Sequence, residues 1–400
     1  MVYEDLHLVL PAQVLEGSQD FLSLPFRVVD EGTVAVLDPS GVPLRDVLSA
    51  RLPTSEQALL QTASLAVDGD TGSLQLGDGT PPRLFQVTLV PSSGELFDRN
   101  VGIFDSDALA GKRVVIVGLG SGGSAVLREL VRAGVGWFLL VDDDRLTPGN
   151  VCRHELSLRD VGRLKVHALA DYVGDRNPTA VVATLTKRLG QYTAVPFVEM
   201  IAEMAPDVMI CGTDNRESRL IVNRAAVETG TYCLFGAVRR RAYAGEILQL
   251  LPGVTPCYQC FLMGLPMDSQ PPTGAAADDG AHTSLPAYAD RPVPAEPGLS
   301  MDIAPVSLML AKLALVRMLK DAGSARFDAL AEDLAAPRLL WIGRREPGTI
   351  YEQWPPLGDS LGEGPRIQQW LGLWLDRHPD CPACALQSQS LPEEDLDFFR

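Results

Sequence analysis

Length, composition and charge set the first limits on this protein. A chain of 400 residues with 46% hydrophobic and 21% charged residues is longer than one typical domain and has the composition of a folded globular protein, which excludes disordered, collagen-like and small disulfide-rich classes. The net charge of −17 repels phosphate backbones and anionic lipid surfaces, so neither nucleic acid nor a membrane is expected as a partner.

The chain shows no signal for membrane insertion or export. Its longest apolar stretch, residues 306–319, carries Lys312 and Arg317 and is shorter than the ~20 residues that a membrane span needs. Residues 1–7 are acidic where a secretion signal would be basic and then apolar. We therefore expect a cytoplasmic protein.

Residues 1–95 are expected to form a separate, small β-rich α+β domain. Alternating or continuous apolar residues predict strands at 33–37 and 85–89, and a capped start at 53–57 predicts a helix over 58–67. The only histidine of this segment, His7, has no Cys, His or paired carboxylate at a useful spacing. The segment is therefore interpreted as a partner-binding or dimerisation domain.

From residue 112 the pattern changes to alternating strands and helices. An apolar run at 113–117, a helical pattern up to residue 133 and a second apolar run at 137–141 predict a βαβ unit. Further segments extend the pattern, with strands at 207–211, 231–235 and 246–251 and a helix at 216–228. This order predicts an α/β fold of the Rossmann-like type, with a mixed, mainly parallel sheet over residues 96–325.

The last third of the chain is less regular. Seven prolines within residues 266–298 predict a mobile crossover loop, and residues 301–322 predict a long buried helix. After these, the C-terminal segment 326–400 is expected to hold one short strand, 339–342, and an irregular tail.

A glycine-rich turn marks a nucleotide site. Gly118, Gly120 and Gly123 follow the first strand and open a helix, where glycine lets the backbone approach phosphate oxygens at the positive helix end. Asp142 and Asp144 end the next strand, from which a carboxylate can accept hydrogen bonds from ribose hydroxyls. These features fit a nicotinamide dehydrogenase as well as an ATP-dependent enzyme.

Polar residues downstream favour ATP. Asn150, Arg153 and Lys165 lie within sixteen residues of one another, and a hydride-transfer enzyme has no need of such cations, whereas a transferring phosphoryl group does. Asp214 directly follows the strand at 207–211 and could hold Mg²⁺ there. A role of Asp214 as a helix cap is equally compatible with its position.

Four of the seven cysteines form two Cys-x-x-Cys pairs. In a reducing cytosol this spacing favours a metal site over disulfides, and four thiolates complete a closed tetrahedral zinc site. The predicted zinc ligands are Cys257, Cys260, Cys381 and Cys384. Such a site would tie the C-terminal tail back to the core.

The ordered motifs resemble one known family. The glycine turn, the Asp-x-Asp at 142–144, Asn150-x-x-Arg153, Lys165, the Cys-x-Thr-Asp-Asn at 211–215 and the cysteine pairs are similar to the adenylating enzymes that activate ubiquitin-like proteins, of the ThiF, MoeB and HesA type. The resemblance covers residues 96–320 and the tail cysteines, and the single compact core favours a bacterial member.

The resemblance implies a reaction and a role for each residue. An enzyme of this type transfers AMP from ATP to the C-terminal carboxylate of a small protein ending in glycine, a ubiquitin-like or sulfur-carrier protein, and releases pyrophosphate. Asp214 would hold Mg²⁺, Arg153 and Lys165 would contact the ATP phosphates, and Asn150 would fix the nucleotide. Asp142 or Asp144 would bind the ribose.

The resemblance also implies a homodimer. Arg99 matches an arginine that reaches into the partner subunit's site in this family. A downstream conjugating enzyme is a further possible partner. Residues 239–241 are three consecutive arginines, which are either a solvated turn or a landing site for the tail or the acidic surface of the substrate.

The sequence departs from the family in one respect. Many relatives carry a cysteine in or after the crossover loop that accepts the activated carboxylate as a thioester, but residues 261–380 contain none. Three explanations follow: the reaction stops at the acyl-adenylate, Cys152 is the acceptor, or a loop cysteine has been removed. We favour the first, because Cys211 and Cys233 lie in apolar strands and Cys152 lies among nucleotide-binding residues.

Three other functions are compatible with parts of the pattern. The first is adenylation of a short peptide, as in the microcin-maturation enzymes, which also carry an N-terminal domain before such a core. The second is an inactive scaffold subunit of an activating complex, although such subunits lose catalytic residues that are present in this sequence. A dehydrogenase would leave Arg153, Lys165 and the four paired cysteines unexplained.

Overall fold

The computed structural model describes residues 6–16, 20–29, 34–38, 40–90, 96–100, 103–104, 107–264, 297–320, 327, 330–331, 334–344 and 368–385. The chain divides into two compact units, Met1–Asp98 and Arg99–Arg400. Each has a hydrophobic core of its own. None of the helices within the described ranges is both long and apolar enough to cross a membrane.

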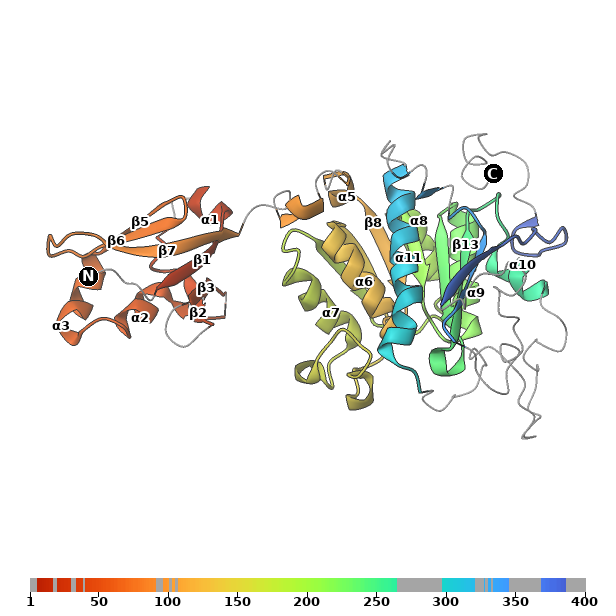
Figure 1. Ribbon diagram of the computed structural model, residues 1–400, viewed down its shortest axis with the longest axis horizontal. Helices are drawn as coiled ribbons and strands as arrows, with labels where there is room; N and C mark the ends of the chain where they lie inside the picture. Colours follow the sequence, from red (N-terminus) through yellow and green to blue (C-terminus); the bar gives the residue numbers. More distant parts are fainter. Residues whose placement is uncertain are drawn as a thin grey trace, which may run out of the picture. The chain divides into compact units, whose positions relative to one another are not determined.

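The first unit is built on one mixed sheet with the strand order β4-β2-β3-β1-β7-β6-β5 (Figure 1). Its core is formed by large apolar side chains such as Leu8, Phe26 and Leu74. The strands are β1 (His7–Pro11), β2 (Pro25–Val28), β3 (Val34–Leu37), β4 (Val42–Pro43), β5 (Ser64–Asp68), β6 (Thr71–Gln75) and β7 (Arg83–Val90). The helices are α1 (Gln13–Glu16), α2 (Leu44–Ser49), α3 (Thr54–Gln57) and the 3-10 helix η1 (Ala58–Thr62).

The helix predicted over 58–67 ends early. Only residues 58–62 are helical, as η1, and Ser64–Asp68 form strand β5. The reason is the spacing of the apolar residues. Leu65 and Val67 are two apart and share the half-buried face of β5, a period of two that fits a strand and not a helix. The prediction was therefore wrong for the second half of this segment.

The second unit holds an eight-stranded sheet with the order β10-β9-β8-β11-β12-β13-β14-β15. The strands from β10 to β12 are parallel to their neighbours, and those from β12 to β15 pair antiparallel, so the sheet is mixed as expected. The strands are β8 (Arg113–Val117), β9 (Trp137–Val141), β10 (Val181–Leu185), β11 (Val208–Cys211), β12 (Cys233–Val238), β13 (Ala244–Leu250), β14 (Arg338–Ile342) and β15 (Gln369–Leu373).

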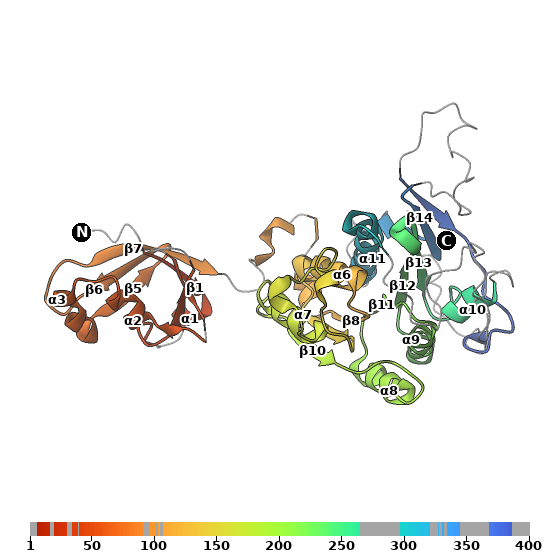
Figure 2. The same ribbon diagram turned by 90° about the horizontal axis from the view of Figure 1, so that it is seen from below.

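Helices cover both faces of this sheet (Figures 1 and 2). One face carries α6 (Ser121–Ala133), α7 (Lys165–Gly174) and α11 (Ser300–Lys320), and the other carries α8 (Ala194–Met204), α9 (Arg216–Thr229) and α10 (Tyr258–Met263). Shorter elements are α5 (Asp107–Ala110) and the 3-10 helices η2 (Asp98–Asn100), η3 (Pro148–Asn150), η4 (Leu158–Asp160) and η5 (Arg240–Ala242).

Side-chain alternation explains why the apolar strands are continuous runs. In β8, Val114 and Ile116 belong to the core under α6, α7 and α11, whereas Val115 and Val117 belong to the core under α8 and α9. Successive residues of a strand point to opposite faces, so a strand covered on both faces needs an apolar residue at every position. This arrangement is a Rossmann-like α/β fold.

The structure adds elements that the apolar patterns did not reveal. Helix α7, strand β10 and helix α8 fill the segment between the two predicted halves of the sheet, and β15 lies in the tail that was expected to be irregular. β15 pairs with β14 and packs Trp370 against Trp341, with ring centroids 5.4 Å apart and the rings tilted by 36°. The predicted mobile loop at 266–298 falls, except for its last two residues, outside the described ranges.

The core of the second unit can be tested at Phe138, which is fully buried in β9. We expect Phe138→Ala to lower the free energy of unfolding of this unit by about 3–5 kcal/mol, because it removes a large side chain and leaves a cavity. Leu158→Ala, at a position 72% exposed, is the control, with an expected change within about 0.5 kcal/mol. Tryptophan fluorescence during denaturant unfolding is a suitable measurement, since all five tryptophans belong to this unit. Equal changes in the free energy of unfolding for the two substitutions would contradict the burial of Phe138 in this core.

Candidate functional site

The site lies where the strand order reverses. After β8 the chain adds β9 and β10 on one side, and then returns to place β11 on the other side of β8. Such a reversal leaves a crevice at the carboxyl ends of the strands, the usual ligand position in open α/β sheets. A cavity of about 410 Å³ opens there. The predicted residues that line it are Gly118, Gly120, Gly123, Asp142, Asp144, Asn150, Arg153, Lys165 and Asp214.

The glycine turn is shaped by two close backbone approaches. Gly118 has a φ of +87°, and a Cβ atom there would lie 2.8 Å from the backbone nitrogen of Thr213. A Cβ on Gly123 would lie 2.0 Å from the carbonyl oxygen of Gly118. At Gly120, by contrast, a Cβ would meet no atom within 4 Å. Gly118 and Gly123 are therefore required by the protein itself, whereas the space beside Gly120 is open to a ligand.

The same turn presents the amino end of α6 to the cavity. Gly120 is the N-cap of α6 and has no side chain to satisfy the first backbone N–H groups of the helix. Ser121, Gly122 and Gly123 line the cavity beside it. Unpaired N–H groups and the positive helix end together favour an anion at this position.

Asp142 holds the glycine turn against the end of β9. Its carboxylate accepts a hydrogen bond from the backbone N–H of Leu119 at 2.7 Å and another from the N–H of Asp144 at 2.8 Å. Burial raises the pKa of Asp142, an effect that Lys165 and the two N–H groups oppose. Asp142 thus acts as a structural anchor, since one of its oxygens bonds the turn at Leu119 and the other bonds the backbone N–H of Asp144.

Lys165 connects this anchor to the open part of the cavity. Its ammonium group lies 2.7 Å from a carboxylate oxygen of Asp144 and 3.8 Å from one of Asp142. The Lys165 side chain is only 8% exposed, whereas that of Asp144 is 68% exposed. Asp144 is therefore the more accessible of the two predicted ribose carboxylates. Lys165 is directed towards Asp142 and Asp144, which form the acidic edge of the cavity.

The segment after this edge is held by its own turn. The side-chain oxygen of Asn150 accepts hydrogen bonds from the backbone N–H and the hydroxyl of Thr147, both at 3.0 Å, which closes η3. Arg153 follows at the cavity wall, near Gly298, two residues before α11. The turn thus places an amide and a guanidinium group on one side of the cavity.

Asp214 lies opposite, at the carboxyl end of β11. Asn215, and not Asp214, caps α9, since its side-chain oxygen accepts a hydrogen bond from the N–H of Ser218 at 2.8 Å. Within the described ranges, the carboxylate of Asp214 makes no hydrogen bond or ion pair. The alternative role of Asp214 as a helix cap is therefore excluded, and its exposed carboxylate is available to a ligand.

Arg219 fixes the loop that carries Asp214. Its Nε donates a hydrogen bond to the carbonyl oxygen of Thr213 at 2.8 Å, and its guanidinium group also donates to the carbonyl of Gly236 in β12. Only 2% of Arg219 is exposed. A buried charge that bonds two strand ends in this way keeps Asp214 at a constant distance from the sheet. The sequence patterns did not reveal this residue.

Sequence reasoning also missed cations of the cavity. Lys187 and Arg188 follow β10, whose strand was not recognised, and both line the cavity. A basic pair two residues after the end of a mostly apolar run is the signal that could have found them. With Arg153, Lys165, Arg239 and Arg241 they make six basic side chains among the described residues of the cavity wall, against four acidic ones. The chain as a whole has a net charge of −17. The cavity therefore suits an anionic ligand.

The three arginines at 239–241 do not share one role. Arg239 lies 3.1 Å from Glu246 and is 15% exposed, so it belongs to a buried ion pair beside the cavity. Arg241 has a φ of +57° and is an exposed residue of the cavity wall. The side chain of Arg240 lies outside the described residues. Arg239 is therefore not a residue of a solvated turn, and both Arg239 and Arg241 line the cavity.

Arg99 is apart from these residues. It is an exposed residue of η2 and is not among the described residues that line the cavity. The four paired cysteines are also outside the cavity.

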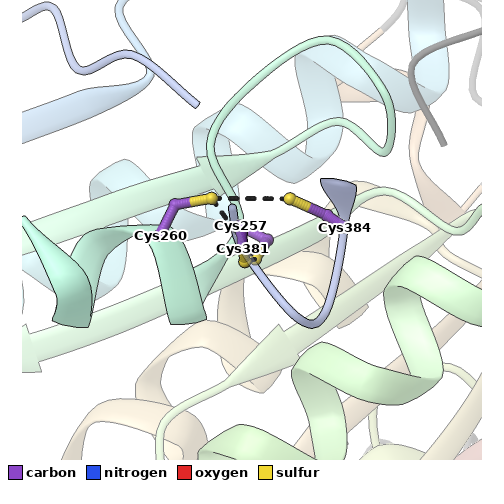
Figure 3. Close-up of side chains that lie close together, drawn as sticks. All are labelled: Cys257, Cys260, Cys381 and Cys384. Atoms are coloured by element: carbon purple, nitrogen blue, oxygen red, sulfur yellow. Dashed lines mark hydrogen bonds between the residues drawn. The ribbon is translucent and has the colours of Figure 1, made fainter. Parts of the chain in front are cut away.

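The paired cysteines form a compact cluster (Figure 3). Cys257 and Cys260 lie at the start of α10, and Cys381 and Cys384 come from the tail, 124 residues further on. The sulfur atoms are 3.4–3.8 Å apart along the three measured contacts, and all four side chains are buried. Ligands of a tetrahedral zinc at ~2.3 Å are separated by about 3.8 Å, so the cluster is compatible with this ion.

The cluster also has a polarised thiol. Hydrogen bonds from the Cys257 thiol and from the backbone N–H of His378 lower the pKa of Cys260. Burial raises the pKa of Cys384. The hydrogen bond between Cys257 and Cys260, together with burial, raises the pKa of Cys257, so it is the close grouping of the four sulfur atoms that is compatible with a metal ion.

Comparison with known proteins identifies the family. The sequence model of the ThiF family matches residues 97–334, more than half of the chain. The chain belongs to the ThiF family. The match begins at residue 97, two residues before the second unit, and covers the glycine turn, the acidic edge, Asp214 and the first cysteine pair.

Curated relatives agree with this family. The sulfur carrier protein ThiS adenylyltransferase of Bacillus subtilis is 33% identical over 178 residues, which are 44% of this chain and 51% of that protein. The ubiquitin-like modifier-activating enzyme 5 of Oryza sativa is 27% identical over 202 residues, 45% of this chain and 48% of that protein. The chain spans about half the length of the curated relatives it matches.

A solved structure shares the fold of this ThiF-family chain. The microcin C7 biosynthetic enzyme MccB, in complex with N-formylated MccA, superposes with a TM-score of 0.50 at 15% identity, over 80% of this chain and 97% of that one. At this identity the likeness concerns the fold alone.

The cysteine cluster of this ThiF-family chain gives a testable prediction. We expect the purified protein to contain about one zinc ion per chain, measured by atomic absorption, because four thiolates saturate a tetrahedral zinc. Cys260→Ser is expected to lose the metal and to lower the thermal midpoint, since the tail is no longer tied to α10. Cys152→Ser, an exposed cysteine outside the cluster, should keep both. A wild-type protein that contains no zinc, and whose thermal midpoint does not change when a chelator is added, would contradict the site.

Proposed function

We propose that this ThiF-family chain transfers AMP from ATP to the C-terminal carboxylate of a ubiquitin-like or sulfur-carrier protein and releases pyrophosphate. The observation that supports it best is the convergence on one cavity of an uncapped helix end, basic side chains and the unpaired carboxylate of Asp214. A hydride-transfer enzyme does not need these cations around its nucleotide.

The parts of the cavity match the parts of ATP. In the proposal, the phosphates lie beside Gly120 and the amino end of α6, where no protein atom lies within 4 Å of the position that a Cβ on Gly120 would take. The ribose hydroxyls donate to Asp144, the exposed carboxylate at the end of β9. Asp142 keeps the turn in place and its side chain is only 9% exposed, so the proposal assigns the sugar to Asp144.

Lys165 would change partners when ATP binds. In the structure its ammonium group is paired with Asp144. Once the ribose occupies Asp144, the phosphates become the strongest nearby acceptors for this charge. The proposal therefore couples recognition of the sugar to the placement of Lys165 on the triphosphate.

The chemistry then depends on positioning and charge. A carboxylate oxygen of the protein substrate attacks the α-phosphorus of ATP in line. The bond to the bridging oxygen breaks, and pyrophosphate leaves with the electron pair. Arg153 and Lys165 stabilise the charge on the phosphates. Asp214 is the residue proposed to hold Mg²⁺, which would neutralise phosphate charge.

The cysteines favour a reaction that ends at the acyl-adenylate. All seven lie within the described ranges. Cys152 is exposed, hydrogen bonds to the carbonyl of Gly149 and does not line the cavity. Cys211 and Cys233 are buried in strands, and burial raises the pKa of Cys233 well above its usual value. We propose that an outside nucleophile, on a conjugating or sulfur-donating partner, takes the activated carboxylate.

A short peptide is the second candidate substrate. The separate first unit stands before the adenylation core, and the fold likeness extends over 97% of the microcin C7 biosynthetic enzyme MccB, which was solved in complex with N-formylated MccA. Mass spectrometry after incubation with ATP distinguishes the two, because a gain of one AMP marks either a folded small protein ending in glycine or a peptide. We further propose a homodimer in which Arg99 serves the site of the second copy.

Gly120 provides a test of nucleotide placement. We expect Gly120→Ala to leave the thermal midpoint unchanged, because the added methyl meets no protein atom within 4 Å. The same methyl would occupy phosphate space, so the affinity for ATP, measured by calorimetry, should fall at least about tenfold. Gly123→Ala is the contrasting variant, since its methyl would lie 2.0 Å from a backbone oxygen and should lower the midpoint. Unchanged ATP binding by Gly120→Ala would refute this placement.

Asp214 provides a test of the mechanism. We expect Asp214→Asn to reduce substrate-dependent exchange of pyrophosphate with ATP by about 100-fold or more, because the charge that holds the metal is lost while the shape is kept. Asp175→Asn, at the exposed end of α7, is the matched control and should exchange normally. Exchange that survives in Asp214→Asn would exclude the assigned role.

A further inference from the structure

His154 is a buried histidine that the proposed reaction does not use. It is 8% exposed, follows Arg153 directly, and is not among the cavity-lining residues. Its Nε2 lies 2.8 Å from the carbonyl oxygen of Leu119, and its Nδ1 lies 3.1 Å from the backbone nitrogen of Leu156. Both ring nitrogens are therefore engaged with the backbone.

These two partners determine the form of the ring. A carbonyl oxygen can only accept, so Nε2 must carry a hydrogen; a backbone N–H can only donate, so Nδ1 must be unprotonated. The geometry thus requires the neutral ring with its hydrogen on Nε2. A proton added at Nδ1 would face the Leu156 N–H and replace a hydrogen bond with a repulsive contact.

The bond to Leu119 reaches the glycine turn. The N–H of Leu119 is held by Asp142 from the end of β9, and its carbonyl is held by His154 from the segment that carries Asn150 and Arg153. The residue between Gly118 and Gly120 is thus fixed on both of its peptide groups, by two different segments. His154 is the link that sets the cationic segment at a constant distance from the turn.

We propose that His154 is a positioning residue whose neutral ring fixes the Leu119 peptide for phosphate binding, so that nucleotide affinity falls when the ring is protonated. The inference rests on the proposed function in one respect: it takes ATP as the ligand of the cavity. It adds a residue and a pH dependence that the proposed reaction does not require.

The surroundings of His154 favour the neutral ring. Burial lowers its pKa, and Lys165 on α7 lowers it further, whereas the Leu119 bond and the charges of Glu155 and Asp160 oppose these effects. Glu155 is itself paired with Arg128 of α6 at 2.6 Å, which reduces its influence. Because the pKa of His154 is below the usual ~6.5, the ring is neutral and the link is intact at neutral pH. The link is lost only as the pH falls through this lowered pKa.

The direction of the pH effect separates this role from a simpler one. A histidine that acted as a cation for phosphate would bind ATP more tightly on acidification, since protonation adds a positive charge. A histidine that positions the turn through its neutral form gives the opposite sign. The proposal is therefore decided by whether acid weakens or strengthens binding.

Two substitutions at this position test the proposal in the full chain. Glutamine carries one donor and one acceptor, so His154→Gln can keep a bond to Leu119 without a titrating ring, whereas His154→Leu keeps none. The probe is ATP with Mg²⁺, and its dissociation constant is measured by calorimetry from about pH 5.5 to about pH 7.5. His167→Gln, at an exposed position of α7, is the control.

We expect wild type and His167→Gln to bind ATP more weakly at the acid end than at the neutral end, by less than about tenfold because the pKa of His154 lies below ~6.5. At neutral pH, His154→Gln should bind ATP as tightly as wild type does, and it should lack the fall in affinity that protonation of His154 causes in acid. Its remaining pH dependence measures the titration of ATP itself and is subtracted from that of wild type. His154→Leu should be about tenfold weaker at neutral pH. In ¹⁵N spectra of the protein, the ring should show its hydrogen on Nε2.

Several outcomes would overturn the proposal: equal pH dependence of wild type and His154→Gln, tighter binding in acid, or a ring protonated on Nδ1. If His154→Leu fails to fold, the comparison of wild type with His154→Gln still decides. A wild-type protein that binds no ATP at any pH would overturn the proposed function and this inference together. ATP binding that is indifferent to position 154 would overturn this inference alone.

Discussion

The hydrogen bond from the Leu119 N–H to the carboxylate of Asp142 is the contact on which the rest of the site depends. It joins the turn after β8 to the end of β9, and so determines where the amino end of α6 points. Taking Asp142 out of water is unfavourable, as its raised pKa shows. The cost is offset by two backbone N–H groups and by Lys165, and this compensation brings the lysine to the edge of the cavity.

A second buried carboxylate, that of Glu246, also holds cations in place, on the side of the cavity formed by Arg239. Burial raises the pKa of Glu246, but Arg239 and Arg338 more than offset this effect, and the net pKa is lowered. One carboxylate thus keeps two guanidinium groups at the junction of β12, β13 and β14. An acidic protein can in this way present a basic cavity, because its cations are gathered by a few buried acids while the surplus of negative charge stays elsewhere.

The cysteine cluster and the cavity are connected through α9. The backbone N–H of Tyr258, next to Cys257, donates to the side chain of Asn223, and the Arg219 guanidinium lies 5.6 Å from the centre of the Tyr258 ring. Arg219 in turn holds the carbonyl of Thr213, beside Asp214. A cluster that ties the tail to α10 therefore also supports the loop that carries the proposed metal ligand, by packing and hydrogen bonds and not by a shared surface.

The sequence by itself determined the βαβ pattern, the glycine turn, the candidate ligands and the two cysteine pairs, because each is a local signal: apolar periodicity, a turn that needs glycine, or a fixed ligand spacing. It could not show that Asn215 rather than Asp214 caps α9, that β5 begins at Ser64, or that Lys187 and Arg188 reach the cavity. Those results, and the roles of Arg219 and His154, were decided by the tertiary structure. They depend on which strand ends meet. Contacts between distant segments, such as the one between His154 and Leu119, 35 residues apart, leave no periodic trace in the chain.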